Sequence, residues 1–256
     1  CSELASDGVL DYLSVVAGSS STLAGAEHIA PPMNHEAGYT APLSAAIKAK
    51  IDIPVFVTGR INQPQIAEQI LASGQADICG MTRAMICDPE ISNKAFTGRS
   101  DDIRACIGCN QACMGHFHAG YPISCIQNPV SGREVKYPTQ EPASSPRSVL
   151  VVGGGPAGMK AAVIAAQRGH KVTLHERGPQ LGGQVLLAQL LPTRAEFGGA
   201  ITNLTHELSQ LGVEINLKSE LNLEAIKFLN PDAVILATGA TPRRPSFEGD
   251  DTTHVV

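Results

Sequence analysis

The sequence predicts an α/β protein with two successive parallel sheets, and three observations lead to this fold class. Near-continuous apolar runs of strand length lie at residues 12–17, 54–58 and 76–81, and further runs follow residue 147. Such runs are typical of parallel strands that are buried on both faces. Amphipathic stretches separate the runs, and a glycine-rich turn follows the first strand of the second set. This alternation of strand and helix is the pattern of βαβ units.

The first set of strands lies in residues 1–104, and two predicted helices connect its strands. Residues 41–50 and 64–73 carry apolar side chains at helical spacing, and a new strand follows each of them after a turn. Three strands cannot close a barrel, so this region is either a small doubly wound sheet or the last part of a (β/α)8 barrel. The chain begins with Cys1 rather than methionine, and we expect the C-terminal strands of a TIM barrel.

The second set begins at residue 147, and we expect a Rossmann-like, dinucleotide-binding domain over residues 147–256. Its predicted strands are residues 148–152, 171–175, 213–217 and 232–237, and its predicted helices are residues 156–168 and 194–211. Between the two sets, residues 105–146 are rich in Cys, Gly, His and Pro and show no sustained period. This segment ends in a linker at residues 137–146, where proline and serine favour an extended connection.

Composition and charge exclude several classes of protein. The chain has 256 residues, of which 43% are hydrophobic and 17% charged, so it can bury a core. Its net charge is -5 without a long run of either sign, which does not fit a nucleic-acid or membrane-surface binder. The longest apolar runs fall far short of the ~20 residues that a membrane helix needs, and the opening residues lack the pattern of a signal peptide. We expect a cytoplasmic protein.

Four of the seven cysteines form the strongest motif in the sequence. They follow the spacing C-x2-C-x3-C-x11-C and are Cys106, Cys109, Cys113 and Cys125. Three thiolates in one turn-rich loop and a fourth from the returning chain can surround a compact cluster, and cysteine is the usual ligand of iron–sulfur clusters. The motif therefore predicts a [4Fe–4S] cluster. A structural zinc site, which usually draws its ligands as two separated pairs, and uncoordinated thiols are the alternatives.

Other histidines and cysteines are expected to have structural roles. His116 and His118 lie between the third and fourth cysteines of the motif and are expected at the surface or behind the ligands. Cys79 lies in a predicted strand and Cys87 after the next turn, and small buried side chains explain both. An odd number of cysteines, clustered in this way, does not suggest the disulfide framework of a secreted protein.

The second motif is a glycine-rich turn between a strand and a helix, with the pattern G-x-G-x-x-G at Gly153, Gly155 and Gly158. The first glycine permits the turn, the second lets a pyrophosphate approach the backbone, and the third lets helix and strand pack closely. Glu176 ends the next strand, where a carboxylate can accept hydrogen bonds from a ribose hydroxyl. An acidic residue there disfavours a 2′-phosphate, so we expect FAD, ADP or NAD rather than NADP.

A third pattern of glycine and arginine ends two successive strands of the first region. Gly59 and Arg60 follow one strand, and Gly80, Thr82 and Arg83 follow the next. At the carboxyl ends of the last two barrel strands, backbone N–H groups and guanidinium groups can hold a cofactor phosphate. On the residues alone, solvated or salt-bridged arginines are the more common explanation.

The order of these motifs resembles the NADH:flavin oxidoreductase branch of the old yellow enzyme family, typified by bacterial 2,4-dienoyl-CoA reductase and trimethylamine dehydrogenase. The resemblance extends over nearly the whole chain and is most specific at residues 104–129, where the cysteine spacing and the intervening residues match. It implies an FMN-binding barrel, one [4Fe–4S] cluster, and a C-terminal domain that binds FAD in the reductases and ADP in trimethylamine dehydrogenase. In the reductases, an NAD(P)H-binding domain interrupts this C-terminal domain.

The resemblance assigns residues of this sequence to each cofactor. Gly59, Arg60, Gly80, Thr82 and Arg83 would hold the FMN phosphate, and the four motif cysteines would hold the cluster. The residues assigned to FAD or ADP are Gly153, Gly155, Pro156, Ala157, Gly158, Glu176, Arg177, Gly183, Gln184, Thr238 and Gly239. His28 is the candidate catalytic residue, in a loop that lacks the Glu-Ala-Arg sequence that follows the catalytic histidine of dienoyl-CoA reductases.

These parts predict an oxidoreductase in which electrons pass between NAD(P)H, FAD, the cluster and FMN and reduce an activated C=C bond of a small molecule. Oxidation of a methylated amine or betaine with the same cofactors is one alternative. An electron-transfer module without its own substrate site is another, and an electron-transfer protein is a candidate partner. We expect the chain to be an internal fragment that shows no turnover by itself.

Overall fold

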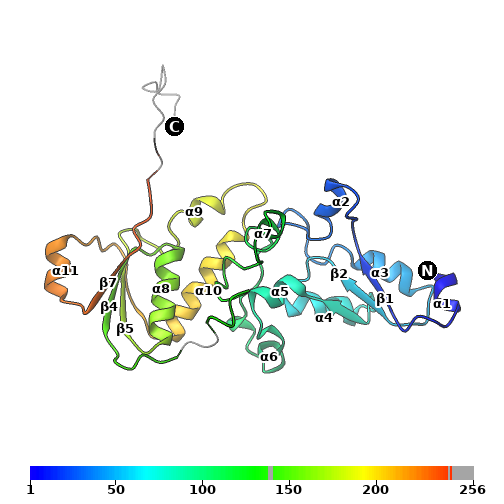
Figure 1. The fold of residues 1–256 in the computed structure, drawn as a ribbon, viewed down its shortest axis with the longest axis horizontal. Helices are drawn as coiled ribbons and strands as arrows, with labels where there is room; N and C mark the ends of the chain where they lie inside the picture. Colours follow the sequence, from blue (N-terminus) through cyan, green and yellow to red (C-terminus); the bar gives the residue numbers. More distant parts are fainter. Residues whose placement is uncertain (138–140, 242, 244–256) are drawn as a thin grey trace, which may run out of the picture.

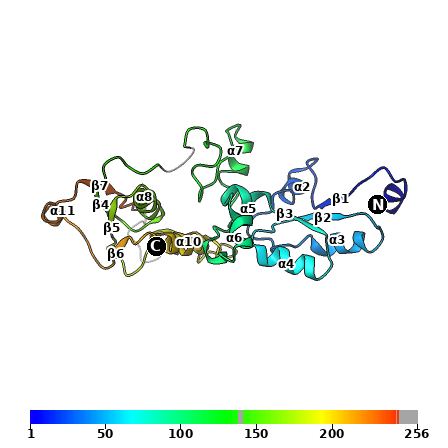
Figure 2. The ribbon, with the colours of Figure 1, turned by 90° about the horizontal axis from the view of Figure 1, so that it is seen from below.

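The computed structural model describes residues 1–137, 141–241 and 243. The middle of the predicted linker, residues 138–140, and the end of the predicted C-terminal domain, residues 242 and 244–256, lie outside the described residues. Two parallel sheets lie at opposite ends of the elongated molecule, and short helices and loops lie between them (Figures 1 and 2).

The N-terminal sheet consists of three parallel strands in the order β1-β2-β3. These strands are β1 (Leu13–Val16), β2 (Val55–Thr58) and β3 (Ile78–Gly80). Val55 and Val57 of β2 are both fully buried, as expected for the central strand. Neighbouring strands follow in sequence order without a reversal, which is the arrangement of consecutive strands in a (β/α)8 barrel rather than of a doubly wound sheet.

Two helices pack against this sheet (Figure 2). The helices of the N-terminal region are α1 (Ser2–Ser6), α2 (Leu23–Glu27), α3 (Ala41–Lys48), α4 (Pro64–Ala72), α5 (Thr82–Cys87), α6 (Ile91–Phe96) and the 3-10 helix η1 (Ser100–Asp102). Ala41 of α3 and Ile70 of α4 meet Val57 in a small core. Both helices have proline in the first turn, where its missing N–H is not needed.

The C-terminal sheet has four parallel strands in the order β6-β5-β4-β7. The strands are β4 (Ser148–Val152), β5 (Lys171–His175), β6 (Glu214–Asn216) and β7 (Ala233–Leu236). The central strand β4 pairs with β5 on one side and with β7 on the other, so the strand order reverses beside β4. In open α/β sheets, ligands bind at the carboxyl ends of the strands at such a reversal.

The helices of this region are α8 (Pro156–Gln167), α9 (Val185–Ala188), α10 (Phe197–Gln210) and α11 (Leu223–Leu229). Met159 and Val163 of α8, Leu208 of α10 and Leu174 of β5 are completely buried in one continuous core. This core has more buried residues than that of the N-terminal region, and it holds the carboxyl ends of β4 and β5 rigidly beside the start of α8.

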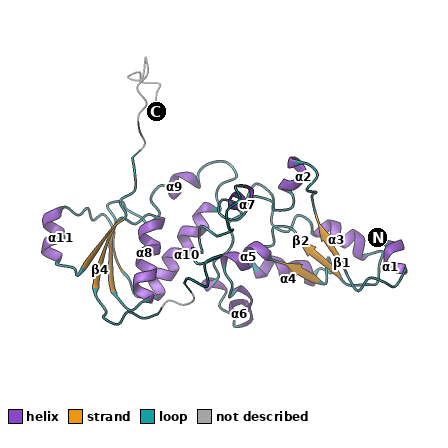
Figure 3. Cartoon of the chain, in the orientation of Figure 1, coloured by secondary structure: helices purple, strands orange, loops and turns teal. Residues whose placement is uncertain are grey.

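The described part of residues 105–146, which connects the two regions, is mostly loop (Figure 3). Its single helix is α7 (Met114–His118), which lies inside the cysteine motif. Figures 1 and 2 show that this segment lies beside α5 and α10, between the two sheets. The segment contacts both regions: Asn128 Nδ2 donates to the carbonyl oxygen of Ile86 in α5, and Ile107 lies close to Gly199 of α10.

The expected strands and long helices are present, with ends that differ by about three residues or fewer. Thr82 and Arg83 are the first residues of α5 rather than loop residues after a strand, and Cys87 ends that helix rather than following a turn. The short helices α5, α6 and α11 were not expected, because six or seven residues show too little periodicity to indicate a helix. Within the described part of the chain, every helix is too short or too polar to cross a membrane.

Candidate functional site

A cavity of about 510 Å³ lies at the carboxyl ends of β4, β5 and β7, and we name it the C-terminal cavity. Ten of the residues assigned to FAD or ADP line it: Gly153, Gly155, Pro156, Ala157, Glu176, Arg177, Gly183, Gln184, Thr238 and Gly239. They come from four separate turns along the sequence. The strand reversal beside β4 therefore brings the turn residues together, as the motif predicts.

The three glycines of the motif differ in what surrounds them. Gly153 has a φ of +112°, and a side chain there would overlap the carbonyl oxygen of Ala237. A Cβ on Gly158 would overlap the carbonyl oxygen of Gly153, so α8 packs directly on the turn. A Cβ on Gly155 would meet nothing within 4 Å. Gly155 lines the cavity, so its open face leaves room for a phosphate close to the backbone.

Glu176 forms the rim of the C-terminal cavity beside the glycine turn. Its Oε2 accepts a hydrogen bond from the backbone N–H of Gly154 at 2.7 Å, and its Oε1 accepts from Gly178 N–H at 2.6 Å. These bonds fix the carboxylate, while each oxygen keeps a second lone pair. The neighbouring His175 binds the Ser219 hydroxyl through Nδ1 at 2.8 Å, and burial lowers its pKa. An oriented carboxylate at this place can accept hydrogen bonds from a ribose.

The second large cavity, of about 620 Å³, lies at the carboxyl ends of β2 and β3, and we name it the N-terminal cavity. Gly59, Arg60, Gly80, Thr82 and Arg83 all line it. Side chains at Gly59 or Gly80 would overlap Thr40 or Thr58, so the backbone approaches its neighbours closely at both strand ends. The structure thus gathers all five residues that the resemblance assigns to the FMN phosphate.

The two arginines of this cavity have protein partners. Arg83 Nη1 donates to Asn110 Oδ1 at 2.6 Å. Arg60 donates to the carbonyl oxygen of His35 and to Glu196. The two arginines therefore attach the N-terminal cavity to the cysteine motif and to the C-terminal region, contacts that the sequence did not indicate.

All seven cysteines are free thiols, and the four motif cysteines line one small cavity, which we name the cysteine cavity. Cys106 and Cys113 also line the N-terminal cavity. Burial raises the pKa of Cys106 and raises that of Cys109 to about 11. A hydrogen bond from Cys87 lowers the pKa of Cys125 to about 6. Within the described residues, no group of three or more His, Cys, Asp or Glu could hold a single metal ion.

Amide side chains fix the cysteine segment to the N-terminal region. Asn62 Nδ2 donates to the carbonyl oxygen of Cys106 at 2.7 Å, and Asn110 Nδ2 donates to that of Ala30 at 2.6 Å. Gln127 Nε2 donates to the carbonyl oxygen of Ala105 at 3.0 Å and to the Cys87 sulfur at 3.3 Å. These bonds hold the backbone at Ala105 and Cys106 and the side chains of Asn110 and Gln127, so they restrict the positions of the thiols.

Asp88 joins the start of the cysteine segment to the end of α5. This buried carboxylate accepts from Lys94 Nζ at 2.7 Å and from the backbone N–H of Arg104 at 2.9 Å. Arg104 Nη1 in turn donates to the carbonyl oxygen of Cys87 at 3.2 Å. These contacts fix the chain that leads from the N-terminal sheet into the motif.

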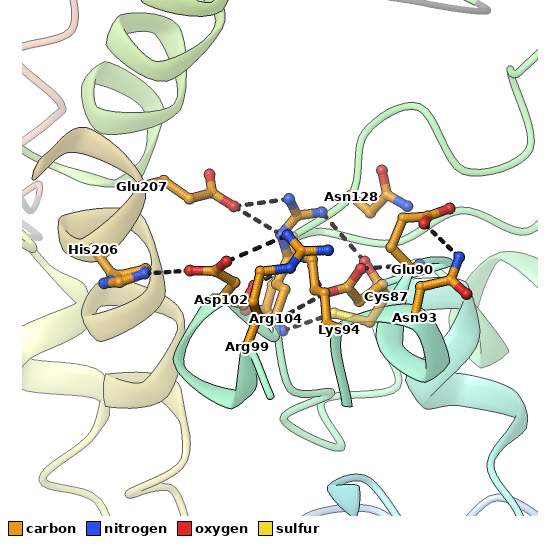
Figure 4. Close-up of polar contacts among 12 residues, drawn as sticks. Cys87, Glu90, Asn93, Lys94, Arg99, Asp102, Arg104, Asn128, His206 and Glu207 are labelled. Carbon is orange, nitrogen blue, oxygen red and sulfur yellow. Dashed lines mark hydrogen bonds and ion pairs between the residues drawn. The ribbon is translucent and has the colours of Figure 1, made fainter. Parts of the chain in front are cut away.

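Helix α10 contacts this segment through charged side chains (Figure 4). Arg104 Nη2 and Glu207 Oε1 are 2.8 Å apart, and Lys160 Nζ lies 3.4 Å from Glu207 Oε2. Burial alone would raise the pKa of Glu207, but the charges of Arg104 and Lys160 outweigh burial and lower it. His206 Nε2 lies 2.8 Å from Asp102 Oδ1, and this hydrogen bond lowers the pKa of Asp102. The C-terminal region is thus attached to the cysteine segment by ion pairs.

His28 lies near the N-terminal cavity but does not line it. Its Nδ1 is 3.2 Å from the Tyr39 hydroxyl, and its ring packs against His35 at a centroid distance of 4.9 Å. His35 Nε2 is 2.9 Å from Glu27 Oε1. A catalytic role for His28 stays a prediction.

Several residues that line the cavities belong to no motif of the sequence. Ser219, Glu220 and Leu221 line the C-terminal cavity, and they follow β6, whose carboxyl end neighbours that of β5. Strand adjacency was the signal that could have indicated them. Phe117 and His118 of α7 line the N-terminal cavity, and no local pattern marks such a contact across the fold.

Two family models match this chain over most of its length. The NADH:flavin oxidoreductase / NADH oxidase family matches residues 11–102, and the pyridine nucleotide-disulphide oxidoreductase family matches residues 147–256. The chain belongs to the NADH:flavin oxidoreductase family. The match over the first region agrees with the TIM-barrel strands expected there, and the match over the second agrees with the Rossmann-like domain.

Curated relatives in this family are named as oxidoreductases. The chain is 42% identical to an NADH oxidase of Thermoanaerobacter brockii over 219 residues. This alignment covers 85% of this chain and 34% of the relative. It is 38% identical to an N,N-dimethylglycine/sarcosine dehydrogenase of Chromohalobacter salexigens, covering 92% of this chain and 34% of the relative. The chain therefore spans about a third of the length of these relatives.

A solved structure has a very similar fold over nearly the whole of this chain. The complex of 2-naphthoyl-CoA reductase with 2-naphthoyl-CoA superposes with a TM-score of 0.90 at 33% identity, covering 98% of this chain and 38% of that chain. Relatives named as reductases and relatives named as amine dehydrogenases thus both match this chain.

Proposed function

We propose that this chain carries three cofactor sites of an iron–sulfur flavoprotein oxidoreductase. In this proposal the N-terminal cavity takes the phosphate end of FMN, the cysteine cavity takes a [4Fe–4S] cluster, and the C-terminal cavity takes FAD or ADP. Electrons pass between NAD(P)H, FAD, the cluster and FMN, and a small molecule with an activated C=C bond is reduced.

The single observation that carries the proposal is the position of the four motif cysteines. They line one cavity, and two of them, Cys106 and Cys113, also line the N-terminal cavity. On its other side, the segment that bears them contacts α10 of the C-terminal region through Arg104. A cluster held by these thiols would lie between the two proposed flavin sites, which is the place that electron transfer between them requires.

The donor groups in each cavity suit the proposed cofactor. Four free thiols are the ligand set of a [4Fe–4S] cluster. Arg60 Nε is buried and has no hydrogen-bond partner in the described residues, so it can donate to a phosphate oxygen. The open face of Gly155 beside the fixed carboxylate of Glu176 suits a pyrophosphate and a ribose.

When bound, the flavins would supply two-electron chemistry and the cluster one-electron transfer. The residues of this chain hold and orient these groups. Arg83 and the strand ends at Gly59 and Gly80 bind the phosphate, Asn62 and Gln127 fix the backbone beside the thiols, and Glu176 orients the adenosine end of the dinucleotide. Phe117 and Ile123 add apolar side chains to the lining of the N-terminal cavity.

Oxidation of a methylated amine or betaine is the second candidate function. The match to N,N-dimethylglycine/sarcosine dehydrogenase favours it, as the match to 2-naphthoyl-CoA reductase favours reduction. In this candidate the electrons leave through the cluster to an electron-transfer protein. Anaerobic assays of the full-length protein with NADH and cinnamate, and with dimethylglycine and an artificial acceptor, separate the two directions. Turnover in neither assay would favour an electron-transfer module without its own substrate site.

The cluster is tested by measuring iron and acid-labile sulfide in anaerobically purified protein. We expect about four irons and four sulfides per chain, with broad absorbance near ~400 nm. One zinc per chain without sulfide would overturn the proposal and favour a structural zinc site.

A pair of variants makes this measurement specific. Cys125→Ser removes a proposed ligand, and we expect it to lose most of the iron and sulfide. Cys79→Ser changes a cysteine of β3 that does not line the cysteine cavity, and we expect it to keep both. Equal iron content in the two variants would contradict the assignment of the motif cysteines.

A further inference from the structure

Arg60 has an unusual backbone and a buried charge. It follows β2 with a φ of +54°, a backbone conformation that residues other than glycine rarely adopt. Its side chain is only 5% exposed. A guanidinium keeps its proton at every ordinary pH, so a buried one needs a negative partner. Strained backbone of this kind is kept where the surrounding structure holds it in place.

The partner of Arg60 comes from the other region of the molecule. Nη2 of Arg60 donates to Oε1 of Glu196, the residue immediately before α10, and Nη1 donates to the carbonyl oxygen of His35. Glu196 lies 136 positions away in the sequence. The C-terminal region therefore supplies the charge that keeps this arginine of the N-terminal cavity buried.

The third nitrogen of the guanidinium group is left for a ligand. Nε of Arg60 is buried and makes no hydrogen bond within the described residues. It lies beside the cysteine segment, because a Cβ built on Gly108 would come within 3.3 Å of it. Arg60 and Gly108 both line the N-terminal cavity. Each Nη group donates to a protein atom, so Nε is the guanidinium nitrogen that has no partner among the described residues and can donate to an acceptor in this cavity.

We propose that Glu196 is a positioning residue for the N-terminal cavity, holding the Arg60 guanidinium so that Nε can donate to the phosphate of FMN. The inference rests on the proposed function, because the phosphate in it belongs to FMN. It means that the C-terminal region completes the binding site of a cofactor held mainly by the N-terminal region.

The proposal sets the order of FMN affinity among three variants of Glu196. Glu196→Ala leaves Arg60 without its carboxylate, so the guanidinium turns toward water, and we expect FMN to bind about tenfold more weakly. Glu196→Gln keeps a carbonyl acceptor of the same length, which can still orient the guanidinium, so we expect it to restore most of the FMN affinity while the lost charge lowers stability. Glu196→Asp keeps the charge but withdraws it by one methylene, so we expect an intermediate affinity.

Glu207→Ala is the matched control on the same helix. Glu207 pairs with Arg104 and Lys160, none of which lines the N-terminal cavity. This change removes an ion pair between the two regions without touching Arg60. We expect the control to lower thermal stability and to leave FMN affinity as in the wild type.

The measurement is the FMN dissociation constant of the full-length protein, from quenching of FMN fluorescence, with a thermal melt of each variant to verify folding. The order wild type, Gln, Asp, Ala from tightest to weakest, with an unchanged Glu207→Ala, supports the proposal. Unchanged affinity in Glu196→Ala overturns it, and so does equal weakening in Glu207→Ala. Tighter binding in both Glu196→Ala and Glu196→Gln also overturns it, because the carboxylate would then compete with the phosphate.

Variants of Arg60 and Glu196 together distinguish the positioning role of Glu196 from the assignment of the N-terminal cavity to the FMN phosphate. If Glu196→Ala does not fold, Glu196→Asp decides, and an unchanged affinity in that variant overturns the proposal. If the wild-type protein fails to bind FMN, or if Arg60→Ala binds it as tightly as the wild type, the assignment of this cavity to the FMN phosphate is wrong. If Arg60→Ala weakens FMN binding and no variant of Glu196 does, the cavity assignment stands and the positioning role is wrong.

Discussion

The cavities beside the two sheets differ in which parts of the chain form their walls. Among the described residues, those that line the C-terminal cavity run from Val152 to Ala240, within the region of the four-stranded sheet. The N-terminal cavity is lined by residues from Ser20 to Ile123, which include the cysteine segment. Its arginines also depend on that segment and on α10. The first cavity is local and the second is composite.

This difference between the cavities follows from the number of strands and the size of the core in each region. The C-terminal region encloses a core of twelve buried residues around β4, and its strand reversal creates the cavity within the region. The N-terminal sheet has three strands and a core of five buried residues, so other parts of the chain form the remaining walls. A cavity of the second kind responds to changes far away in the sequence.

The largest effect is expected from Gly158→Val, which tests whether the C-terminal cavity depends on local packing alone. The added side chain would overlap the carbonyl oxygen of Gly153, so α8 would have to move away from the turn. We expect a loss of about 3 kcal/mol in the free energy of unfolding, measured by urea denaturation, together with loss of ADP binding. Gly155→Ala is the control: its side chain meets nothing within 4 Å, so stability should be kept while ADP affinity falls.

The next effect is expected from Glu207→Gln, which tests the attachment of the two regions. Arg104 would lose its carboxylate while its side chain is 16% exposed, and we expect a loss of about 2 kcal/mol in the free energy of unfolding at pH 7. The pKa of Glu207 is lowered in the folded protein. The wild type should therefore lose the stability that the ion pair contributes as the pH falls below ~4.3, the ordinary pKa of a glutamate in the unfolded chain. The stability difference between the two proteins should therefore shrink in acid. A constant difference across this pH range would contradict the ion-pair explanation.

The local cavity could be predicted from the sequence more completely than the composite one. The glycine turn and Glu176 lie within one βαβ unit, where spacing along the chain sets positions in space, so the motif indicated their place at one cavity. The other lining residues that were expected, such as Gln184 and Thr238, came from the family resemblance. The cysteine spacing likewise indicated thiols that share a cavity. The bonds from Arg60 to Glu196 and from Arg83 to Asn110 were missed, because partners 136 and 27 positions apart leave no periodic signal.

Arg83→Ala should have a smaller effect, confined to the composite cavity. Arg83 lines the N-terminal cavity and donates to Asn110. We expect FMN to bind about tenfold more weakly, because one charge-assisted contact to the phosphate is lost. ADP binding at the C-terminal cavity should be unchanged, and calorimetric titration with each ligand checks both expectations. A change in ADP affinity would show that the two cavities are coupled more widely than the contacts indicate.

The smallest effect is expected from Glu224→Ala on α11. Its carboxylate pairs with Lys227 at 3.0 Å, but both side chains are well exposed, at 79% and 62%. Exposed pairs of this kind contribute little, so we expect a change below about 0.5 kcal/mol in the free energy of unfolding and no change in either ligand affinity. A larger loss would mean that α11 contributes to the C-terminal cavity in a way that its exposure does not suggest.

The carboxylate of Asp88 has a consequence for where the chain can change in length. Because it binds Lys94 and the backbone of Arg104 at the same time, the residues from the end of α5 to the first motif cysteine form a closed loop of fixed size. An insertion or deletion there would displace Cys106 from the other thiols. Related sequences should therefore keep this interval constant and vary in length outside it, for example at the exposed residues 133–137.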